Sequence, residues 1–219
     1  MNYKMKKIIG IPFLLIFINL GFILFESEVF KNPMRIIPIL ILNIFISIDI
    51  LIRPISTKKD EYNRLIPAIS FLSMPLIVLL PYLEFKVILD EITLLTHFSF
   101  YSFITGVILS IMGGVILLLS RIQIGQYGGP KIVVEDRHQL ITNGFYEHVR
   151  HPIYLGFLFL FFGYSLAFGS FLMTIIIFLF LFLIFNKRME IEERLLIAEF
   201  GKKYELYVTR TKKLIPYLY

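Results

Sequence analysis

The sequence predicts an all-α membrane protein, a bundle of about six spanning helices that ends in a helical hairpin. Of its 219 residues 57% are hydrophobic, and the mean hydropathy is +0.78, which is high for a soluble domain of this length. Six apolar runs also reach or approach the roughly 20 residues that a helix needs to cross a bilayer. Helices are expected in these runs because a backbone in lipid must satisfy its own hydrogen bonds.

The first four spans are expected at about residues 8–25, 36–52, 65–83 and 98–120. Pro75 and Pro81 each remove a backbone hydrogen bond, so the third span should be bent or broken. In the fourth span, small residues should let a neighbouring helix approach closely, at Gly106, Gly113 and Gly114.

A charged pair closes the second span, where Asp49 and Arg53 lie one helical turn apart. A charge inside a span is a candidate for a functional site. An ion pair between residues i and i+4 at the membrane interface explains the same residues more simply, and this is our interpretation.

Two shorter apolar runs follow at about 152–168 and 170–186, divided by Phe168-Gly169-Ser170. Each has about 17 residues and would be about 25 Å long as a helix. One helix made of both would overshoot the bilayer, so a tight helical hairpin is expected. Gly156 and Gly163 lie seven residues apart on one face, where the partner helix should pack closely.

The distribution of positive charge predicts the orientation. With six spans, the N-terminus, the loops 53–64 and 121–151 and the tail from 187 lie on one side of the membrane. That side holds all of the 22 Lys and Arg except Lys31, Arg35 and Lys86. The positive-inside rule places both termini and this side in the cytoplasm. The net charge of +6 therefore reflects membrane orientation, and no nucleic-acid partner is expected.

Several chemistries are excluded by what the sequence lacks. Without cysteine there is no disulfide, thiolate metal site or cysteine nucleophile. The 4 histidines are too few for a membrane di-iron site, and Pro152 disturbs the helical spacing of His148 and His151, so no metal site is expected. The sequence also has no P-loop and no G-x-S-x-G motif.

Polar residues gather in two clusters at the open end of the predicted hairpin. Pro152 suits the first position of a helix, which leaves His151 just outside it, beside helix N–H groups that attract anions. Arg188 and Glu192 share a helix face, while Glu193 points about 100° away. Each cluster alone could be a headgroup anchor or an ordinary helical ion pair. Because the hairpin brings them together, we predict one cytoplasmic pocket for a zwitterionic soluble ligand and a lipid-borne substrate.

The polar clusters and their surroundings resemble a known family. The segment L-I-T-N-G-F-Y-E-H-V-R-H-P-I-Y-L-G, the hairpin, and then R-M-E-I-E-E-R-L-L-I-A-E-F-G-K-K-Y-E-L-Y resemble the isoprenylcysteine carboxyl methyltransferases, integral-membrane enzymes that use S-adenosylmethionine. The resemblance covers about residues 138–216. It implies a cofactor pocket in a C-terminal methyltransferase region, 121–219. The N-terminal spans show no such match, and residues 1–120 are expected to form the lipid and acceptor side. The cofactor contacts that it implies are His138, Gln139, Leu140, Ile141, Tyr146, His151, Pro152, Ile153, Tyr154 and Glu192.

The same resemblance places Arg188 at the methyl acceptor, and the candidate catalytic residues are Arg188, Glu193 and Arg150. A carboxylate acceptor needs a cation to orient it and no base, and the planar guanidinium of Arg188 suits that role. An amine acceptor would need a base, for which Glu193, His148 and His151 are the nearby candidates.

The expected reaction is therefore O-methylation of an isoprenylcysteine-type carboxylate. The alternative is N-methylation of a phospholipid amine, since related phospholipid methyltransferases have a similar tail. An NADPH-dependent sterol-type reductase shares an R-H-P-x-Y-like motif, and a non-catalytic membrane scaffold is also open. The expected partners are the bilayer and a lipophilic acceptor, prenylated or phospholipid. The expected location is a prokaryotic cell membrane or, in a eukaryote, the endoplasmic reticulum.

Overall fold

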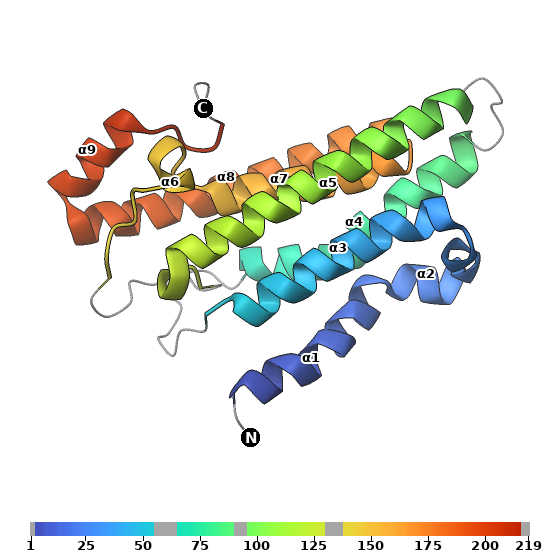
Figure 1. Ribbon diagram of the computed structural model, residues 1–219, viewed down its shortest axis with the longest axis horizontal. Helices are drawn as coiled ribbons and strands as arrows, with labels where there is room; N and C mark the ends of the chain where they lie inside the picture. Colours follow the sequence, from blue (N-terminus) through green and yellow to red (C-terminus); the bar gives the residue numbers. More distant parts are fainter. Residues whose placement is uncertain (1–2, 55–64, 90–95, 130–137, 216–219) are drawn as a thin grey trace.

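A computed structural model describes residues 3–54, 65–89, 96–129 and 138–215 of the chain. In these ranges the regular structure is helical, apart from one parallel β-bridge between Val149 and Lys212. Figure 1 shows an elongated helical bundle with α6 and α9 at one end. The α-helices are α1 Tyr3–Ile18, α2 Leu20–Phe25, α3 Pro33–Ile52, α4 Leu65–Glu84, α5 Thr96–Ile124, α6 Phe145–His148, α7 Pro152–Ala167, α8 Phe171–Phe200 and α9 Lys202–Arg210.

The apolar helices fit a polytopic membrane protein. Four are long and apolar enough to cross a bilayer, at Pro33–Ile52, Ala68–Val87, Phe100–Tyr127 and Phe171–Phe200. Two shorter apolar helices lie at Lys7–Ile18 and Pro152–Ala167. Each overlaps one of the six predicted runs, while the number of crossings stays a prediction. Most of loop 53–64 lies outside the described residues.

One span prediction differs from the structure. The first run is divided at Asn19 into α1 and α2, and is not one helix over 8–25. The third run, predicted to be bent or broken, is not broken: α4 continues through Pro75 and Pro81, and a bend there stays a prediction. A single proline removes one helical hydrogen bond, and the bonds of the adjacent turns hold the helix together.

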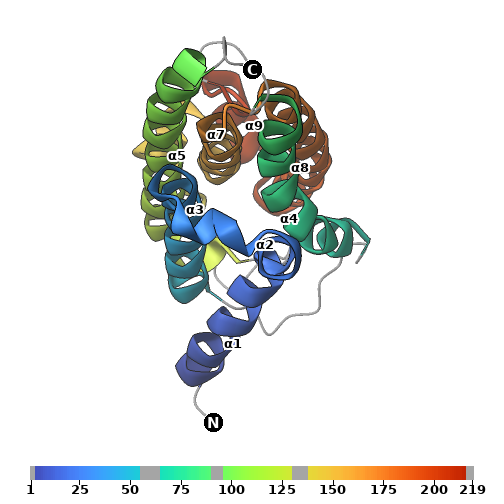
Figure 2. The same ribbon diagram turned by 90° about the vertical axis from the view of Figure 1, so that its right-hand side faces the viewer.

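Helix α7 lies inside the bundle, between α5 and α8 (Figure 2). It packs most closely on α5. A Cβ atom added at Gly113 of α5 would lie 2.3 Å from the backbone nitrogen of Leu160, and one added at Gly163 would lie 2.5 Å from the carbonyl oxygen of Gly106. The predicted close approach is thus confirmed for Gly106 and Gly113.

The partner predicted for the glycines of α7 was wrong. Gly156 and Gly163 face α5, since an added Cβ atom at Gly156 would meet the backbone of Leu117 at 2.6 Å. The hairpin partner α8 instead brings large aromatic rings to α7, such as Phe178 against Phe162 at a centroid distance of 5.9 Å. Bulky rings keep helix axes apart, so the glycine contact forms with α5. Gly114 faces a third helix, through Phe45 of α3.

We expect Gly113→Ala to destabilise the protein by about 1–3 kcal/mol, because the new methyl group would enter the backbone of α7. Thermal unfolding in detergent measures the effect. Gly10→Ala is the matched control, since no atom lies within 4 Å of its added Cβ and alanine favours a helix. Equal melting temperatures for the two variants would contradict the close packing of α5 on α7.

The last residue of α4 caps the first turn of α8. The carboxylate of Glu84 accepts hydrogen bonds from the backbone N–H groups of Leu172 at 3.0 Å and Met173 at 2.7 Å, and from the hydroxyl of Ser170. First-turn N–H groups have no partner within their own helix, and the positive end of the helix dipole favours an anion. Glu84 thus fixes the start of the helix whose other half carries Arg188 and Glu192.

Glu84→Ala should lower the free energy of unfolding by about 1–2 kcal/mol, the usual effect of removing a helix cap. Glu84→Gln retains one acceptor oxygen and should lose less. Chemical denaturation of both variants in mixed micelles provides the measurement. An alanine variant as stable as the parent protein would mean that the cap contributes nothing.

Candidate functional site

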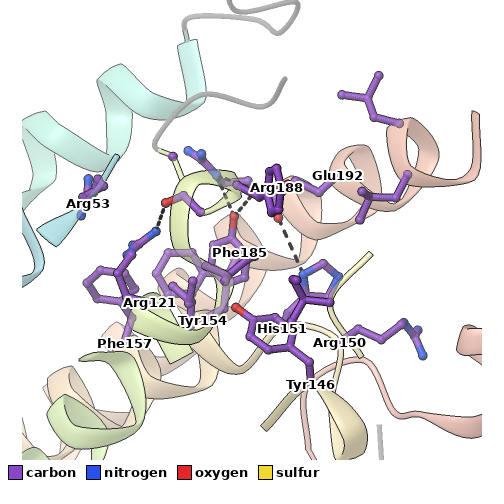
Figure 3. A pocket seen from close by; sticks show the side chains of 18 of the residues that line it. Arg53, Arg121, Tyr146, Arg150, His151, Tyr154, Phe157, Phe185, Arg188 and Glu192 are labelled. Carbon is purple, nitrogen blue, oxygen red and sulfur yellow. Dashed lines mark hydrogen bonds and ion pairs between the residues drawn. The ribbon is translucent and has the colours of Figure 1, made fainter. Parts of the chain in front are cut away.

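A cavity of about 290 Å³ lies where α5, α7, α8 and α9 meet the segment 138–141. One part of its wall is apolar, with Met74, Phe157, Phe161, Leu181 and Phe185. The remainder is rich in charged and hydroxyl groups (Figure 3). The cavity is therefore suited to a ligand, or a pair of ligands, with a polar and an apolar part.

The Arg150-His151-Pro152 motif is held by the chain beyond α9. Pro152 opens α7, and the residue before a proline is pushed away from the helical conformation. The extended backbone pairs with the C-terminal segment: the Arg150 N–H donates to the Lys212 carbonyl at 2.8 Å, and the His151 N–H to the Lys213 carbonyl at 3.1 Å. The tail therefore contributes backbone as well as acidic side chains.

Glu193 contacts both Arg150 and His151. The Nε of Arg150 donates to Oε1 of Glu193 at 2.6 Å, and the Nε2 of His151 lies 3.2 Å from the same oxygen. Arg150 also donates to the Thr211 carbonyl at 2.7 Å. Glu193 does not itself line the cavity, so its placement suits a residue that positions Arg150 and His151.

Glu192, Tyr154 and Arg188 form a second network on the cavity wall. The hydroxyl of Tyr154 donates to Oε1 of Glu192 and accepts from the Nε of Arg188 at 2.8 Å. The same Nε lies 3.3 Å from Oε1 of Glu192, and Nδ1 of His151 is 3.7 Å from Oε2. Helices α7 and α8 therefore bring the two polar clusters into contact, and Glu192 and Glu193 lie against opposite sides of His151.

Aromatic side chains form another part of the wall. The rings of Tyr127 and His138 are stacked with centroids 4.3 Å apart, and Phe200 meets His138 edge-on at 5.5 Å. Such a platform suits a flat heteroaromatic group. Tyr204 is 1% exposed, lines the cavity, and has a buried hydroxyl without a hydrogen-bond partner in the described structure. A ligand atom could supply that partner.

Tyr207 links α9 to α6 by a hydrogen bond. Its hydroxyl donates to the carbonyl of Tyr146 at 2.6 Å, and the hydroxyl of Tyr146 is 3.4 Å from the carbonyl of Ser120. Burial raises the pKa of Tyr207 above its ordinary value, so the phenol stays protonated and remains a donor. Through these bonds α5, α6 and α9 are joined around the cavity.

A buried ion cluster completes the wall. Asp49 is 1% exposed and pairs with Arg53 through one oxygen and with the Nε of Arg121 through the other, at 2.7 Å. Arg121 also donates to the carbonyl of Gly128. The predicted pair of Asp49 and Arg53 is present, and it belongs to a set of three residues in which Asp49 and Arg121 are buried and Arg53 is half-buried.

Most of the predicted site residues line this one cavity. Pro152 and Glu193 do not, and His148 is exposed and also lies outside it. In the described part of the chain, no group of three His, Asp or Glu could hold a metal ion. The lining residues that had been predicted are His138, Gln139, Leu140, Ile141, Tyr146, Arg150, His151, Ile153, Tyr154, Arg188 and Glu192.

Sequence reasoning missed several lining residues. Arg121 closes the fourth span, and a charge at a span end could have marked it. Tyr204 and Tyr207 lie in the K-K-Y-E-L-Y end of the segment that carries the family resemblance, which could have marked them. Tyr127 carries no such signal, because aromatic residues are common throughout this chain.

Comparison with known proteins finds similarity to membrane methyltransferases. Residues 101–203 match the phospholipid methyltransferase family. A probable protein-S-isoprenylcysteine O-methyltransferase of Oryza sativa subsp. japonica is 34% identical over 126 residues, which cover 57% of this chain and 65% of that protein. The Schizosaccharomyces pombe protein-S-isoprenylcysteine O-methyltransferase is 38% identical over 79 residues, 36% of this chain and 34% of its own length. The match thus spans just under two thirds of the rice relative.

The fold has a solved counterpart. The eukaryotic intramembrane Ras methyltransferase ICMT (isoprenylcysteine carboxyl methyltransferase) superposes with a TM-score of 0.68, over 95% of this chain and 74% of that one. The sequences are 21% identical. At this identity the likeness concerns the fold, a polytopic arrangement of membrane helices.

Proposed function

The chain belongs to the isoprenylcysteine carboxyl methyltransferase family, and on that premise we propose that it transfers a methyl group from S-adenosylmethionine to an isoprenylcysteine-type carboxylate. The observation that carries the proposal is the contact between the Arg188–Tyr154–Glu192 network and an apolar wall within one cavity. A charged, water-soluble methyl donor and a lipid-borne acceptor need both surfaces at the same place.

The residues present fit the methyl donor. The stacked pair of Tyr127 and His138 suits an adenine ring, and the carboxylate of Glu192 suits the α-ammonium group. The buried hydroxyl of Tyr204 offers a hydrogen-bonding group to a polar ligand. S-adenosylmethionine would supply the sulfonium methyl group, and the protein would supply position and charge.

Arg188 is proposed to orient the acceptor. Its Nε is fixed by Tyr154 and Glu192, which sets the plane of the guanidinium at the cavity wall. A carboxylate is already a nucleophile at neutral pH, so no proton has to leave. Methyl transfer is an in-line displacement, and holding the carboxylate in that line is the main contribution that the chain can make. The apolar rings of Phe157, Phe161 and Phe185 suit the isoprenoid chain and exclude water.

N-methylation of a phospholipid amine is the second candidate, and the match to the phospholipid methyltransferase family favours it. An amine must lose a proton during the reaction. Of the three bases considered, only His151 lines the cavity, and Nε2 of that residue lies 3.2 Å from Glu193. The geometry thus leaves one candidate base for an amine acceptor, and the similarity to protein-S-isoprenylcysteine O-methyltransferases favours the carboxylate.

We place the cavity and both termini on the cytoplasmic side, on the strength of the charge asymmetry. In the same proposal, residues 121–219 hold the methyl donor, and residues 1–120 provide most of the lipid-facing side.

Titration calorimetry in detergent tests the class of enzyme. We expect S-adenosylhomocysteine to bind with micromolar affinity and NADPH not to bind. Binding of NADPH alone would support the reductase, and binding of neither would support a scaffold. Mass spectrometry after incubation with labelled S-adenosylmethionine then separates the acceptors: label on an S-farnesylcysteine carboxylate supports the proposal, and label on phosphatidylethanolamine supports the alternative.

A further inference from the structure

Among the described residues around the cavity, the paired arginines and carboxylates are unequal in number. Arg150 pairs with Glu193 at 2.6 Å and Arg188 with Glu192 at 3.3 Å. Arg53 and Arg121 share the single carboxylate of Asp49. Among the described residues of these networks, the excess positive charge is therefore at the Asp49 cluster.

This excess lies away from the part of the wall that Arg150 and His151 form. Figure 3 shows Arg53 and Arg121 on the far side of Tyr154 from His151 and Arg150. The charge of Arg188 still acts on the cluster. Burial is the main cause that lowers the pKa of Arg53, Asp49 opposes it, and the positive charges of Arg121 and Arg188 lower the pKa further. The ammonium group of Lys7 lies beside the cluster and donates to the carbonyls of Leu51 and Arg53.

The cluster also has a donor to offer. The Nε atom of Arg53 is buried and has no hydrogen-bond partner within the described residues. A buried donor without a partner is unfavourable, and an anion in the cavity would relieve both the missing bond and the excess charge. Arg53 and Arg121 both line the cavity, so such an anion could reach them.

We propose that Arg53 and Arg121, held by Asp49, form an anion subsite that binds the oxyanion of a lipophilic acceptor. This inference rests on the proposed function. It assigns the orientation of the acceptor and the attraction of its anion to different arginines. Arg188 gives the acceptor its direction, but the nearby Glu192 reduces its attraction for an anion. The Asp49 cluster supplies the uncompensated charge that draws the oxyanion into the cavity.

The oxyanion could be a carboxylate or a phosphate, and paired ligands distinguish them. The first pair is S-farnesylthiopropionate and its neutral carboxamide. The second is a short-chain phosphatidic acid and the diacylglycerol with the same chains. Binding to the purified full chain in nanodiscs is measured for all four, with and without S-adenosylhomocysteine.

We expect the parent protein to prefer the anionic member of one pair by about tenfold or more, as a hydrogen-bonded ion pair provides. Arg53→Gln should reduce this preference to about threefold or less, and Arg53→Lys should retain most of it. Arg194→Gln is the control, since Arg194 is exposed and lies outside the cavity. Arg53 is the better site for substitution because it follows the end of α3 and is 28% exposed, whereas Arg121 is 6% exposed.

The pair that shows the preference identifies the oxyanion. The inference is overturned if neither pair shows a preference, or if Arg53→Gln leaves it unchanged in a protein that melts like the parent. It is also overturned if Arg53→Gln weakens S-adenosylhomocysteine as much as the anionic lipid, because the cluster would then serve the methyl donor. Failure of the parent protein to bind S-adenosylhomocysteine counts against the proposed function instead, and the lipid pairs still report on the subsite.

Discussion

Glu192→Ala is expected to abolish binding of S-adenosylhomocysteine, with a loss of affinity of at least about 100-fold. In the parent protein the Glu192 carboxylate accepts from Tyr154 and Arg188 and lies 3.7 Å from Nδ1 of His151, so it is fixed before any ligand arrives. An α-ammonium group would lose its anionic partner in the variant. It would also meet the positive charge of Arg188 without the Glu192 carboxylate between them, and that charge would repel it. Titration calorimetry measures the affinity directly.

Glu190→Ala is the matched control for this variant. Glu190 is on the same helix, two residues away, and pairs with Lys187 at 3.4 Å outside the cavity. Its removal should leave the affinity for S-adenosylhomocysteine within about twofold of the parent, as expected for an exposed ion pair. If Glu192→Ala bound S-adenosylhomocysteine as tightly as Glu190→Ala, the cofactor assignment of Glu192 would be wrong.

Arg188→Ala should reduce turnover by about 100-fold or more while S-adenosylhomocysteine still binds. The guanidinium is held by Tyr154 at 2.8 Å and by Glu192 at 3.3 Å, so removing it takes away an oriented group at the cavity wall. Small errors in the position of a reacting group reduce in-line transfer by about this factor. Initial rates with S-farnesylcysteine, over a range of acceptor concentrations, separate kcat from KM.

Arg194→Ala removes a guanidinium from the exposed side of the same helix and should leave the rate unchanged. Arg188→Lys keeps the charge but not the planar fork of donors, so we expect only partial recovery. If Arg188→Ala lost only affinity for S-adenosylhomocysteine and kept a normal kcat at saturation, Arg188 would be assigned to the cofactor and not to the acceptor.

The local features of the fold could be predicted because nearby residues encode them. Hydropathy alone marks the six apolar helices. Gly169 turns the chain between α7 and α8 with φ of 73°, and Gly201 ends α8 with φ of 51°, both in the region that favours glycine. Pro152 begins α7 for an equally local reason. These features depend on residues within one or two helical turns of each other.

The orientation of α7 about its own axis could not be predicted in this way. The helix is apolar on every face, so its pattern does not indicate which neighbour each face meets. Gly156 and Gly163 appeared suited to the hairpin partner, yet they pack on α5. Which neighbour packs on these glycines depends on which helix has a surface complementary to them. That complementarity is a property of two segments that are separate in the sequence.

By itself, the sequence determined the membrane class, the hairpin and the candidate residues on either side of it, since periodicity and turn residues act over short distances. Only the tertiary structure decided which distant groups meet in and around the cavity. Asp49 and Arg121 lie 72 residues apart in the chain, and Arg150 contacts Thr211 across 61 residues. Such pairs form because burying a charge requires an opposite charge beside it, and the packing of whole helices determines which one is within reach.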